Sequence, residues 1–308
     1  MERTEKRDEL DGRMQRIEQL LARIARQLEA RGEARQGMIQ EILLSQAAYL
    51  GDYRALTYLR SGQKIFVDTR SVDVASHLLL GGEWEPQYVA AFTRLLRPGH
   101  VVLDLGANQG VYSLLAAGRV APNGHVYAFE PNPRFHPLLK DSIAVNGLDS
   151  VITLVGKAVA DREGETALVF EDRRPAGGRL SSASSPGPTG DGTGLTCMVE
   201  TIVLDREFPD LRVDVVKMDI EGAEASALNG MTALIDRSHD LRIMMEFSPL
   251  LMSTFNRNAE YAANFLASRG FCCWKINADG SLSPTRWEVL LAERDAIQNV
   301  IVSRQNLP

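Results

Sequence analysis

Acidic side chains gather where one apolar run of the chain gives way to charge. Asp219, Glu221 and Glu224 directly follow such a run, and Glu246 stands near the end of the next one. Carboxylates placed in this way can orient a hydroxyl group, accept its proton, or bind a divalent cation through their oxygens. Glu224 fits the first turn of a helix, where the helix dipole favours an acid. Asp219, Glu221 and Glu246 are therefore the candidate catalytic residues, and Asp219 with Glu246 are the candidate ligands if a metal is bound.

A glycine-bounded turn follows an earlier apolar run, which contains Asp104. Gly106 and Gly110 stand four residues apart, without the Gly-x-Gly-x-x-Gly spacing that lets a pyrophosphate approach a helix N-terminus. Ala107 and Asn108 occupy the space of the missing glycine, which favours an adenine nucleoside without phosphates. S-adenosylmethionine fits, because its zwitterionic amino-acid tail can bond to the turn backbone and to Asp104.

The next apolar run supplies the other half of a nucleoside site. It ends in Glu130, whose carboxylate can accept hydrogen bonds from both ribose hydroxyls, and Pro131 fixes the turn that follows. NAD would use such an acid as well, so Glu130 predicts adenosine without choosing the cofactor. After the third apolar run, Ala158 can present its backbone to the adenine edge.

The order of apolar runs predicts the sheet that positions these residues. Seven runs with helical segments between most of them indicate a mostly parallel sheet with helices on both faces. Asp219 and Glu246 then lie at the carboxyl ends of their strands, where open α/β sheets bind ligands. The predicted strands are Val101–Leu105, Val126–Phe129, Ile152–Val155, Val213–Met218, Ile243–Phe247, Cys272–Ile276 and Val300–Val302, and the predicted helices are Gly110–Gly118, Pro133–Asn146, Ala223–Asp236 and Ala259–Ser268.

An extra hairpin is predicted after the third strand, from residues 164–170 and 198–204. The segment 172–195 between them is rich in Gly, Pro, Ser and Thr. A loop of this length is either a disordered insertion or a lid over a site. Its place beside the expected active-site rim favours a flexible lid.

A heptad pattern marks residues 1–37. About three heptads place Ile at a and Leu at d, which favours a parallel coiled-coil dimer. A single amphipathic helix packed on its own domain is the alternative. The residues of the seam are Leu10, Met14, Ile17, Leu21, Ile24 and Leu28.

Residues 38–98 form a predicted lead-in subdomain before the main domain, residues 99–308. Within it, the pattern predicts a helix over residues 39–59, a strand over Lys64–Asp68 and a helix over Gln87–Leu96. We expect this block to lie against the entrance of the sheet.

Composition limits the partners of the chain. A net charge of −6 and a pI near 5.5 argue against general affinity for nucleic acid. The charged N-terminus lacks the apolar core of a secretory signal, and no apolar run reaches the length that spans a bilayer. Three cysteines without Cys-x-x-Cys spacing indicate reduced thiols. We therefore expect a cytoplasmic protein.

Four motifs taken together resemble the FkbM-type S-adenosylmethionine-dependent O-methyltransferases. The resemblance covers roughly residues 80–250, since the turn at Trp84-Glu85-Pro86 also resembles the segment that precedes the family's core. It implies a Rossmann-like class I methyltransferase fold and methyl transfer to a hydroxyl of a sugar or of a polyketide-type natural product. Related sugar methyltransferases use magnesium, so Mg²⁺ is a candidate cofactor beside S-adenosylmethionine. The motifs are Asp104–Gly110, Phe129–Pro133, Lys217–Glu224 and Glu246.

Residues and resemblance together define the expected site and reaction. We expect a saccharide hydroxyl as acceptor, because hydroxyl-rich molecules suit an acid-lined rim, and a homodimer formed through the N-terminal helix. The alternatives are a polyketide-type acceptor, a NAD-dependent dehydrogenase, which the missing glycine disfavours, and a non-catalytic scaffold, which the acids disfavour. The candidate cofactor-binding residues are Glu85, Asp104, Gly106, Asn108, Gly110, Ser113, Glu130, Pro131, Ala158 and Asp219.

Overall fold

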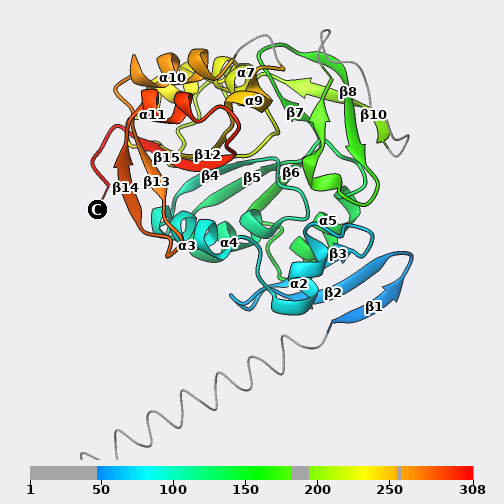
Figure 1. The fold of residues 1–308 in the computed structure, drawn as a ribbon. Helices are drawn as coiled ribbons and strands as arrows, with labels where there is room; N and C mark the ends of the chain where they lie inside the picture. Colours follow the sequence, from blue (N-terminus) through cyan, green and yellow to red (C-terminus); the bar gives the residue numbers. More distant parts are fainter. Residues whose placement is uncertain (1–46, 182–193, 255–257, 308) are drawn as a thin grey trace, which may run out of the picture. The chain divides into compact units, whose positions relative to one another are not determined.

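The computed structural model describes residues 47–181, 194–254 and 258–307. Its central element is an eight-stranded sheet (Figure 1). The strand order is β14-β13-β15-β12-β11-β4-β5-β6. In that order, the strands are Leu282–Thr285, Cys272–Ile276, Gln298–Ser303, Arg242–Phe247, Val215–Met218, Val101–Leu105, His125–Phe129 and Ile152–Val155.

The strand directions confirm the mostly parallel sheet predicted from the sequence. From β12 to β6 all neighbours pair in parallel, whereas β15 lies antiparallel between β12 and β13. The chain passes from β4 outward to β6 and then returns to the other side of β4 with β11, which creates a switch point between β4 and β11. All seven predicted strands are present. The eighth, β14, was not predicted because Pro284 interrupts its apolar pattern, and proline is tolerated there at the edge of the sheet.

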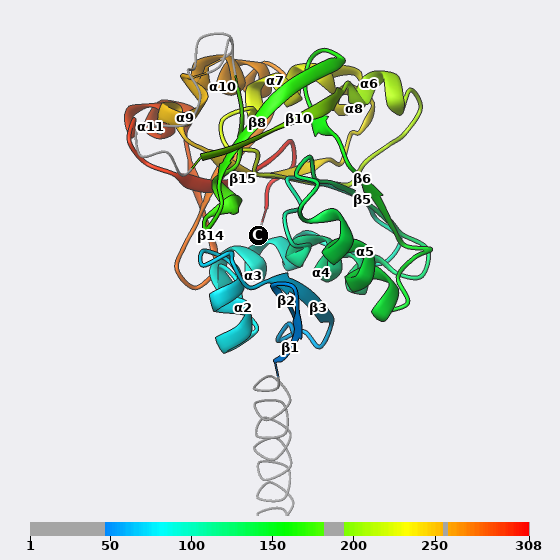
Figure 2. The ribbon, with the colours of Figure 1, turned by 90° about the vertical axis from the view of Figure 1, so that its right-hand side faces the viewer.

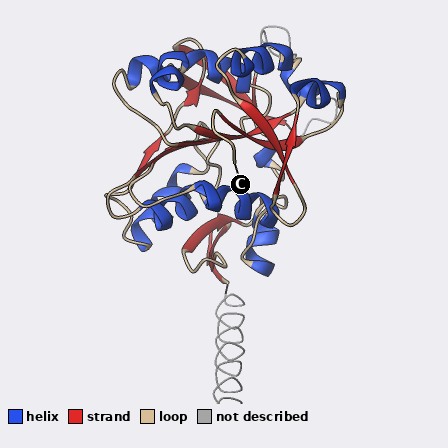
Figure 3. Cartoon of the chain, turned by 90° about the vertical axis from the view of Figure 1, so that its left-hand side faces the viewer, coloured by secondary structure: helices blue, strands red, loops and turns tan. Residues whose placement is uncertain are grey.

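Helices cover both faces of this sheet, as predicted (Figures 1 and 3). Side chains alternate along β4, so Leu103 and Leu105 join one hydrophobic cluster while Val102 joins the other. Asp104 therefore points to the same face as Val102, the face that α4 covers. On that side lie α2 (Ala75–Gly81), α3 (Pro86–Leu95), α4 (Val111–Val120) and α5 (His136–Val145); on the other lie α7 (Glu224–Gly230), α8 (Thr232–Arg237), α9 (Pro249–Met252), α10 (Ala259–Ala267) and α11 (Trp287–Ala292), with the short α6 (Leu204–Glu207) beside α8.

The helix predicted over residues 39–59 is wrong for the part that the structure describes. There the chain forms β1 (Ala48–Gly51) and β2 (Arg54–Tyr58), which pair antiparallel with each other and with β3 (Lys64–Asp68). Positive φ values of 48° at Asp52 and 58° at Tyr53 make the hairpin turn. The side chains of β2 are alternately more and less buried, as in a strand. The spacing of the apolar residues in the sequence suggested a helix instead. Residues 39–46 lie outside the described residues, as does the predicted coiled coil of residues 1–37.

A second, four-stranded sheet stands beside the main one, in the order β7-β10-β8-β9 (Figure 2). Its long antiparallel pair, β8 (Gly164–Glu171) with β10 (Gly194–Ile202), confirms the predicted hairpin. The short members are β7 (Ala158–Val159) and β9 (Arg179–Leu180), and a single 3₁₀ turn, η1, spans Pro175–Gly177. The predicted flexible loop 172–195 thus contains regular structure up to residue 180, and residues 182–193 lie outside the described part. No helix among the described residues has the length and apolar content to cross a membrane.

Candidate functional site

The turn after β4 is shaped by close contact with the loop after β11. Gly106 has a φ of +82°, and a Cβ atom there would lie 2.0 Å from the carbonyl oxygen of Asp219. Gly110 has a φ of +96°, and its Cβ would lie 2.6 Å from Cδ2 of Leu139. Only glycine meets both demands at these two positions. The absence of side chains here lets the backbone of Asp219 lie directly against the turn.

Glu130 connects this turn to the end of β5. Its Oε2 accepts a hydrogen bond of 2.6 Å from the backbone N–H of Asn108, and its Oε1 accepts one of 2.7 Å from the N–H of Asn132. Burial raises the pKa of Glu130 to about 7, although both N–H donors act in the opposite direction. Each carboxylate oxygen retains a further lone pair for a ligand hydroxyl.

Asp104 lies beneath the turn, fully buried. Its Oδ2 accepts a hydrogen bond of 2.5 Å from the hydroxyl of Ser113 on α4, while its Oδ1 has no hydrogen-bond partner among the described residues. Burial raises the pKa of Asp104, and the nearby Lys217 acts against that rise. The hydrogen bond between Asp104 and Ser113 thus holds α4 against β4. Neither residue lines the pockets described below.

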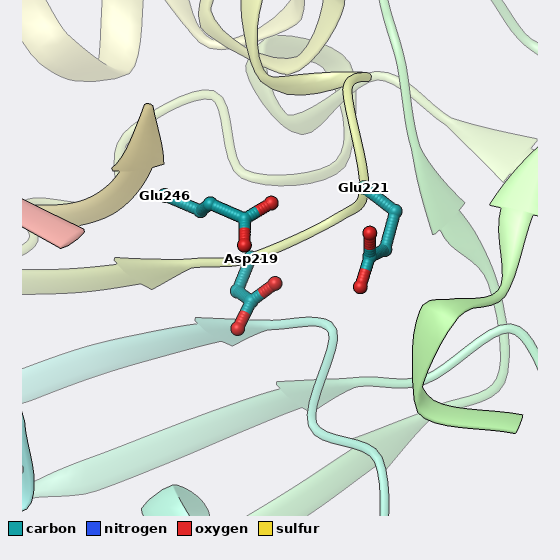
Figure 4. Close-up of side chains that lie close together, drawn as sticks. All are labelled: Asp219, Glu221 and Glu246. Carbon is teal, nitrogen blue, oxygen red and sulfur yellow. The ribbon is translucent and has the colours of Figure 1, made fainter. Parts of the chain in front are cut away.

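Three carboxylates meet at the ends of β11 and β12, as predicted. One oxygen from each of Asp219, Glu221 and Glu246 lies within 4.8 Å of the others (Figure 4). Burial, followed by the charges of the neighbouring acids, raises the pKa of Glu221 to about 8 and that of Glu246 to about 10. Oε2 of Glu246 is buried without a hydrogen-bond partner among the described residues. Such a cluster is satisfied by protons, by a hydroxylic ligand or by a divalent cation.

Glu224 stands next to this cluster but has a structural role. Its Oε1 accepts hydrogen bonds from the N–H groups of Ile220, at 3.1 Å, and Gly222, at 3.3 Å. It is also the first residue of α7, which agrees with its expected place in a first helical turn. Glu224 therefore shapes the loop that carries Asp219 and Glu221.

Lys217 was not among the site residues predicted from the sequence. Its side chain is only 4% exposed, and its Nζ lies 3.0 Å from Oδ2 of Asp219 and 4.7 Å from the ring centroid of Tyr112. The Tyr112 hydroxyl in turn donates a hydrogen bond of 3.1 Å to Oε2 of Glu85. Burial acts to lower the pKa of Lys217, but the carboxylates of Asp219 and Asp104 outweigh it and raise the pKa. A lysine inside an apolar strand was the sequence signal for this role.

Backbone strain concentrates around the same residues. Glu85, Asn108 and Glu221 have φ values of 47°, 51° and 55°. Asparagine adopts this left-handed region readily, whereas glutamate does so rarely. Strained residues of this kind persist where function requires a fixed side-chain direction, and both glutamates point into the walls of the site described next.

Two adjoining pockets share Gly106, Asn108, Ala176, Asp219 and Glu221 in their walls. We call one the Glu130 pocket, with ≈ 600 Å³ of empty space, and the other the acid pocket, with ≈ 610 Å³, open solvent included in each. The Glu130 pocket is also lined by Phe129, Glu130, Pro131, Phe135, Lys157 and Ala158, and the acid pocket by Trp84, Glu85, Tyr112, Lys217 and Glu246.

A short strap, residues 172–181, closes one side of both pockets, and Ala176 lines each of them. Arg134 fastens the start of the strap. Its Nη1 donates to the carbonyl oxygen of Asp172 at 2.7 Å and to its Oδ1 at 2.9 Å, while its Nε donates to Oδ2 of Asp68 at 2.5 Å. No titratable side chain of the strap is among the residues that line the pockets, but the charge of Arg179 acts to lower the pKa of Glu221.

The structure thus brings most of the predicted site residues together. Glu85, Glu130, Pro131 and Ala158 line the pockets together with the shared wall residues, whereas Asp104, Gly110 and Ser113 lie behind or beside those walls. Sequence reasoning missed Lys217 and Tyr112, and Tyr112 carries no motif because only packing brings it to the pocket. The strap lies within the loop 172–195, which was expected beside the site.

Comparison with known proteins gives relatives that cover parts of the chain. It is 36% identical over 74 residues to the protein-L-isoaspartate O-methyltransferase of Methanopyrus kandleri, which is 23% of this chain and 33% of that protein. It is 24% identical over 207 residues to the arsenite methyltransferase of Halobacterium salinarum, 59% of this chain and 46% of that protein. The chain therefore spans between a third and a half of the length of these curated relatives.

Among solved structures, that of M. jannaschii TYW2 in complex with AdoMet matches part of this chain. The TM-score is 0.44 at 14% identity, with 83% of this chain and 86% of that chain covered. The family described as "Methyltransferase FkbM domain" matches residues 104–273, more than half of the chain and the region that carries the glycine turn, Glu130 and the acid cluster. The fold is the class I methyltransferase fold expected from the sequence, and the chain belongs to the FkbM methyltransferase domain family.

Proposed function

We propose that the protein transfers the methyl group of S-adenosylmethionine to a hydroxyl oxygen of a saccharide. The observation that carries this proposal is the adjacency of the two pockets, since Gly106, Asn108, Asp219 and Glu221 belong to both. A nucleoside held in the Glu130 pocket directs its 5′ substituent toward this shared wall. Asp219 and Glu221 of the carboxylate cluster are part of this wall, and Glu246 lines the acid pocket beside it, where an acceptor would stand.

The Glu130 pocket suits adenosine without phosphates. Glu130 offers its remaining lone pairs to the ribose hydroxyls, and Phe129, Phe135 and Ala158 supply apolar surface for the base. The turn also lacks the Gly-x-Gly-x-x-Gly spacing that lets a pyrophosphate approach a helix N-terminus. This supports a sulfonium nucleoside over NAD.

In the proposed reaction the acceptor oxygen forms a bond to the methyl carbon while the bond between that carbon and the sulfonium breaks. The bond's electron pair stays on sulfur, which leaves as a neutral thioether, and the acceptor's proton passes to a carboxylate of the cluster. Because the raised pKa values of Glu221 and Glu246 keep both protonated near neutral pH, the carboxylate of Asp219, ion-paired with Lys217, is the group placed to take that proton. Positioning of the two reactants supplies much of the remaining acceleration.

The cluster also fits a hard divalent cation such as Mg²⁺. Asp219, Glu221 and Glu246 offer three carboxylate oxygens within 4.8 Å of one another, and one buried oxygen of Glu246 has no protein partner among the described residues. These residues would hold the ion, which would supply Lewis acidity toward the acceptor hydroxyl. Turnover that survives EDTA unchanged would limit the cluster to proton transfer.

Support for a saccharide acceptor comes from the acid pocket. Glu85, Glu246 and Glu221 provide several hydrogen-bond acceptors for a polyhydroxylated molecule, and Trp84 adds an aromatic surface beside them. A polyketide-type acceptor would present fewer hydroxyls to the same walls. For the whole protein we further propose a homodimer, on the basis of the heptad seam of residues 10–28, which sedimentation of the full chain tests against a variant with that seam made polar.

Calorimetry and labelled methyl transfer test the proposal. S-adenosylhomocysteine should bind the wild type, and Glu130→Ala should weaken it about 10-fold or more, whereas exposed Glu165→Ala on β8 should not. Asp219→Asn should remove about 100-fold or more of the turnover while keeping most of the affinity. Thermal stabilisation by NAD and not by S-adenosylhomocysteine would refute the cofactor, and methylation of polyketide alcohols without any saccharide in the panel would refute the acceptor.

A further inference from the structure

The acid pocket is lined by many more acidic than basic side chains. Four carboxylates line the acid pocket, those of Glu85, Asp219, Glu221 and Glu246, and Lys217 is the one cationic side chain among its lining residues in the described part of the chain. A ligand ammonium finds several partners there, whereas Lys217 is the cationic partner that these lining residues offer to a ligand carboxylate.

We propose that Lys217 Nζ binds the carboxylate of the amino-acid tail of the methyl donor. The inference rests on the proposed function, and it assigns a carboxylate subsite to the end of β11. The donor's ammonium group then faces Glu85, which lines the same pocket.

Lys217 is held rigidly for such a role. Its Nζ has the Asp219 carboxylate at 3.0 Å and the face of Tyr112 at 4.7 Å, and Tyr112 is itself fixed by its hydrogen bond to Glu85. A lysine ammonium has three N–H donors, and Asp219 is the one hydrogen-bond acceptor that the described residues give it. A donor remains for a ligand anion, and no rotamer freedom has to be lost when that anion binds.

The position of Lys217 in the sheet also matches the expected path of the tail. It pairs with Asp104 across the parallel β11–β4 ladder, beside the switch point and next to the glycine turn. A nucleoside seated on Glu130 has its 5′ substituent pointing to this place, because the two pockets meet at Gly106 and Asn108. The rival partner for the carboxylate is the group of backbone N–H donors at the start of α4.

Two thioether ligands separate these alternatives by calorimetry. One is S-adenosylhomocysteine, and the other is 5′-S-(3-aminopropyl)-5′-thioadenosine, which keeps the ammonium and lacks the carboxylate. Lys217→Met should weaken S-adenosylhomocysteine about 10- to 100-fold, the loss expected for one charge-assisted hydrogen bond, and leave the aminopropyl ligand unchanged or tighter. The matched control is Lys275→Met on β13, outside the walls of both pockets, whose lysine is 33% exposed and pairs with Glu293 at 2.7 Å; it should weaken neither ligand.

A second variant guards against misfolding of the single one. Lys217→Met combined with Asp219→Asn removes both members of the buried ion pair, and its preference for S-adenosylhomocysteine over the aminopropyl ligand should collapse relative to Asp219→Asn alone. Equal weakening of both ligands, or an unchanged preference, would overturn the inference and assign the carboxylate to the α4 backbone. Wild-type protein that binds neither ligand would instead overturn the proposed function.

Discussion

Replacing Glu246 with glutamine is expected to stabilise the protein at alkaline pH. Burial, and then the charges of Asp219 and Glu221, raise the pKa of Glu246 from 4.5 to about 10. A raised carboxyl pKa favours the folded state fully below the unfolded pKa, and this contribution is lost as the pH rises toward the folded value. At about pH 8 the ionisation of Glu246 in the unfolded chain therefore costs at most about 5 kcal/mol of stability, against less than about 1 kcal/mol at about pH 5.

Relaxation and water entry reduce that upper bound, so we expect Glu246→Gln to gain about 1–3 kcal/mol at about pH 8. In a domain of this size the gain corresponds to a rise in Tm of about 3–10 °C. Thermal unfolding followed by circular dichroism in EDTA-containing buffer at about pH 5 and about pH 8 measures it, with exposed Glu165→Gln as control. A Tm at about pH 8 no higher than that of wild type, or a gain of the same size at both pH values, would refute the reasoning.

Two further predictions concern the turn and the strap. Gly106→Ala should lower the free energy of unfolding, measured in urea, by about 3 kcal/mol or more, because its Cβ meets a backbone carbonyl at 2.0 Å. Gly62→Ala, at a residue with a φ of +97° and open space around it, should lower it by only about 1 kcal/mol. Equal losses in both variants would show that the surrounding backbone relaxes to relieve the clash. Arg134→Met should speed hydrogen exchange of the backbone amides of residues 172–178 at least about 10-fold, because the ion pair with Asp172 is lost. The control Arg206→Met, which breaks an exposed ion pair, should leave that exchange unchanged. The same slow exchange in both variants would show that the strap is held by packing.

The apolar runs of the sequence and the turn residues between them made most of the central sheet predictable. Seven strands were expected where they occur, and the five that pair in parallel are buried, continuous apolar runs that are easily recognised. The hairpin of β8 and β10 was predicted from the same kind of pattern. The misassigned segment, residues 48–58, has apolar residues at spacings compatible with a helix. The hairpin turn at Asp52 and Tyr53 has Gly51, with a φ of 88°, directly before it, but its two central residues are not glycines.

The sequence by itself determined which chemical groups the site contains. Asp219, Glu221 and Glu246 follow or end neighbouring strands, and parallel strands place their carboxyl ends at one edge of a sheet. The spacing of Gly106 and Gly110 likewise favoured a nucleoside without phosphates. These conclusions needed only strand direction and chain order, which the local pattern contains.

Only the tertiary structure decided how these groups act on one another. The 4.8 Å grouping of the three acids, their raised pKa values and the enclosure of Lys217 between Asp219 and Tyr112 depend on burial and on distances across separate elements. Gly106 shows the same division: the sequence marks it as a glycine of a turn, but only packing reveals that the Asp219 carbonyl occupies the place of its side chain. Electrostatic energies depend steeply on distance and local dielectric, and neither is written in the order of residues.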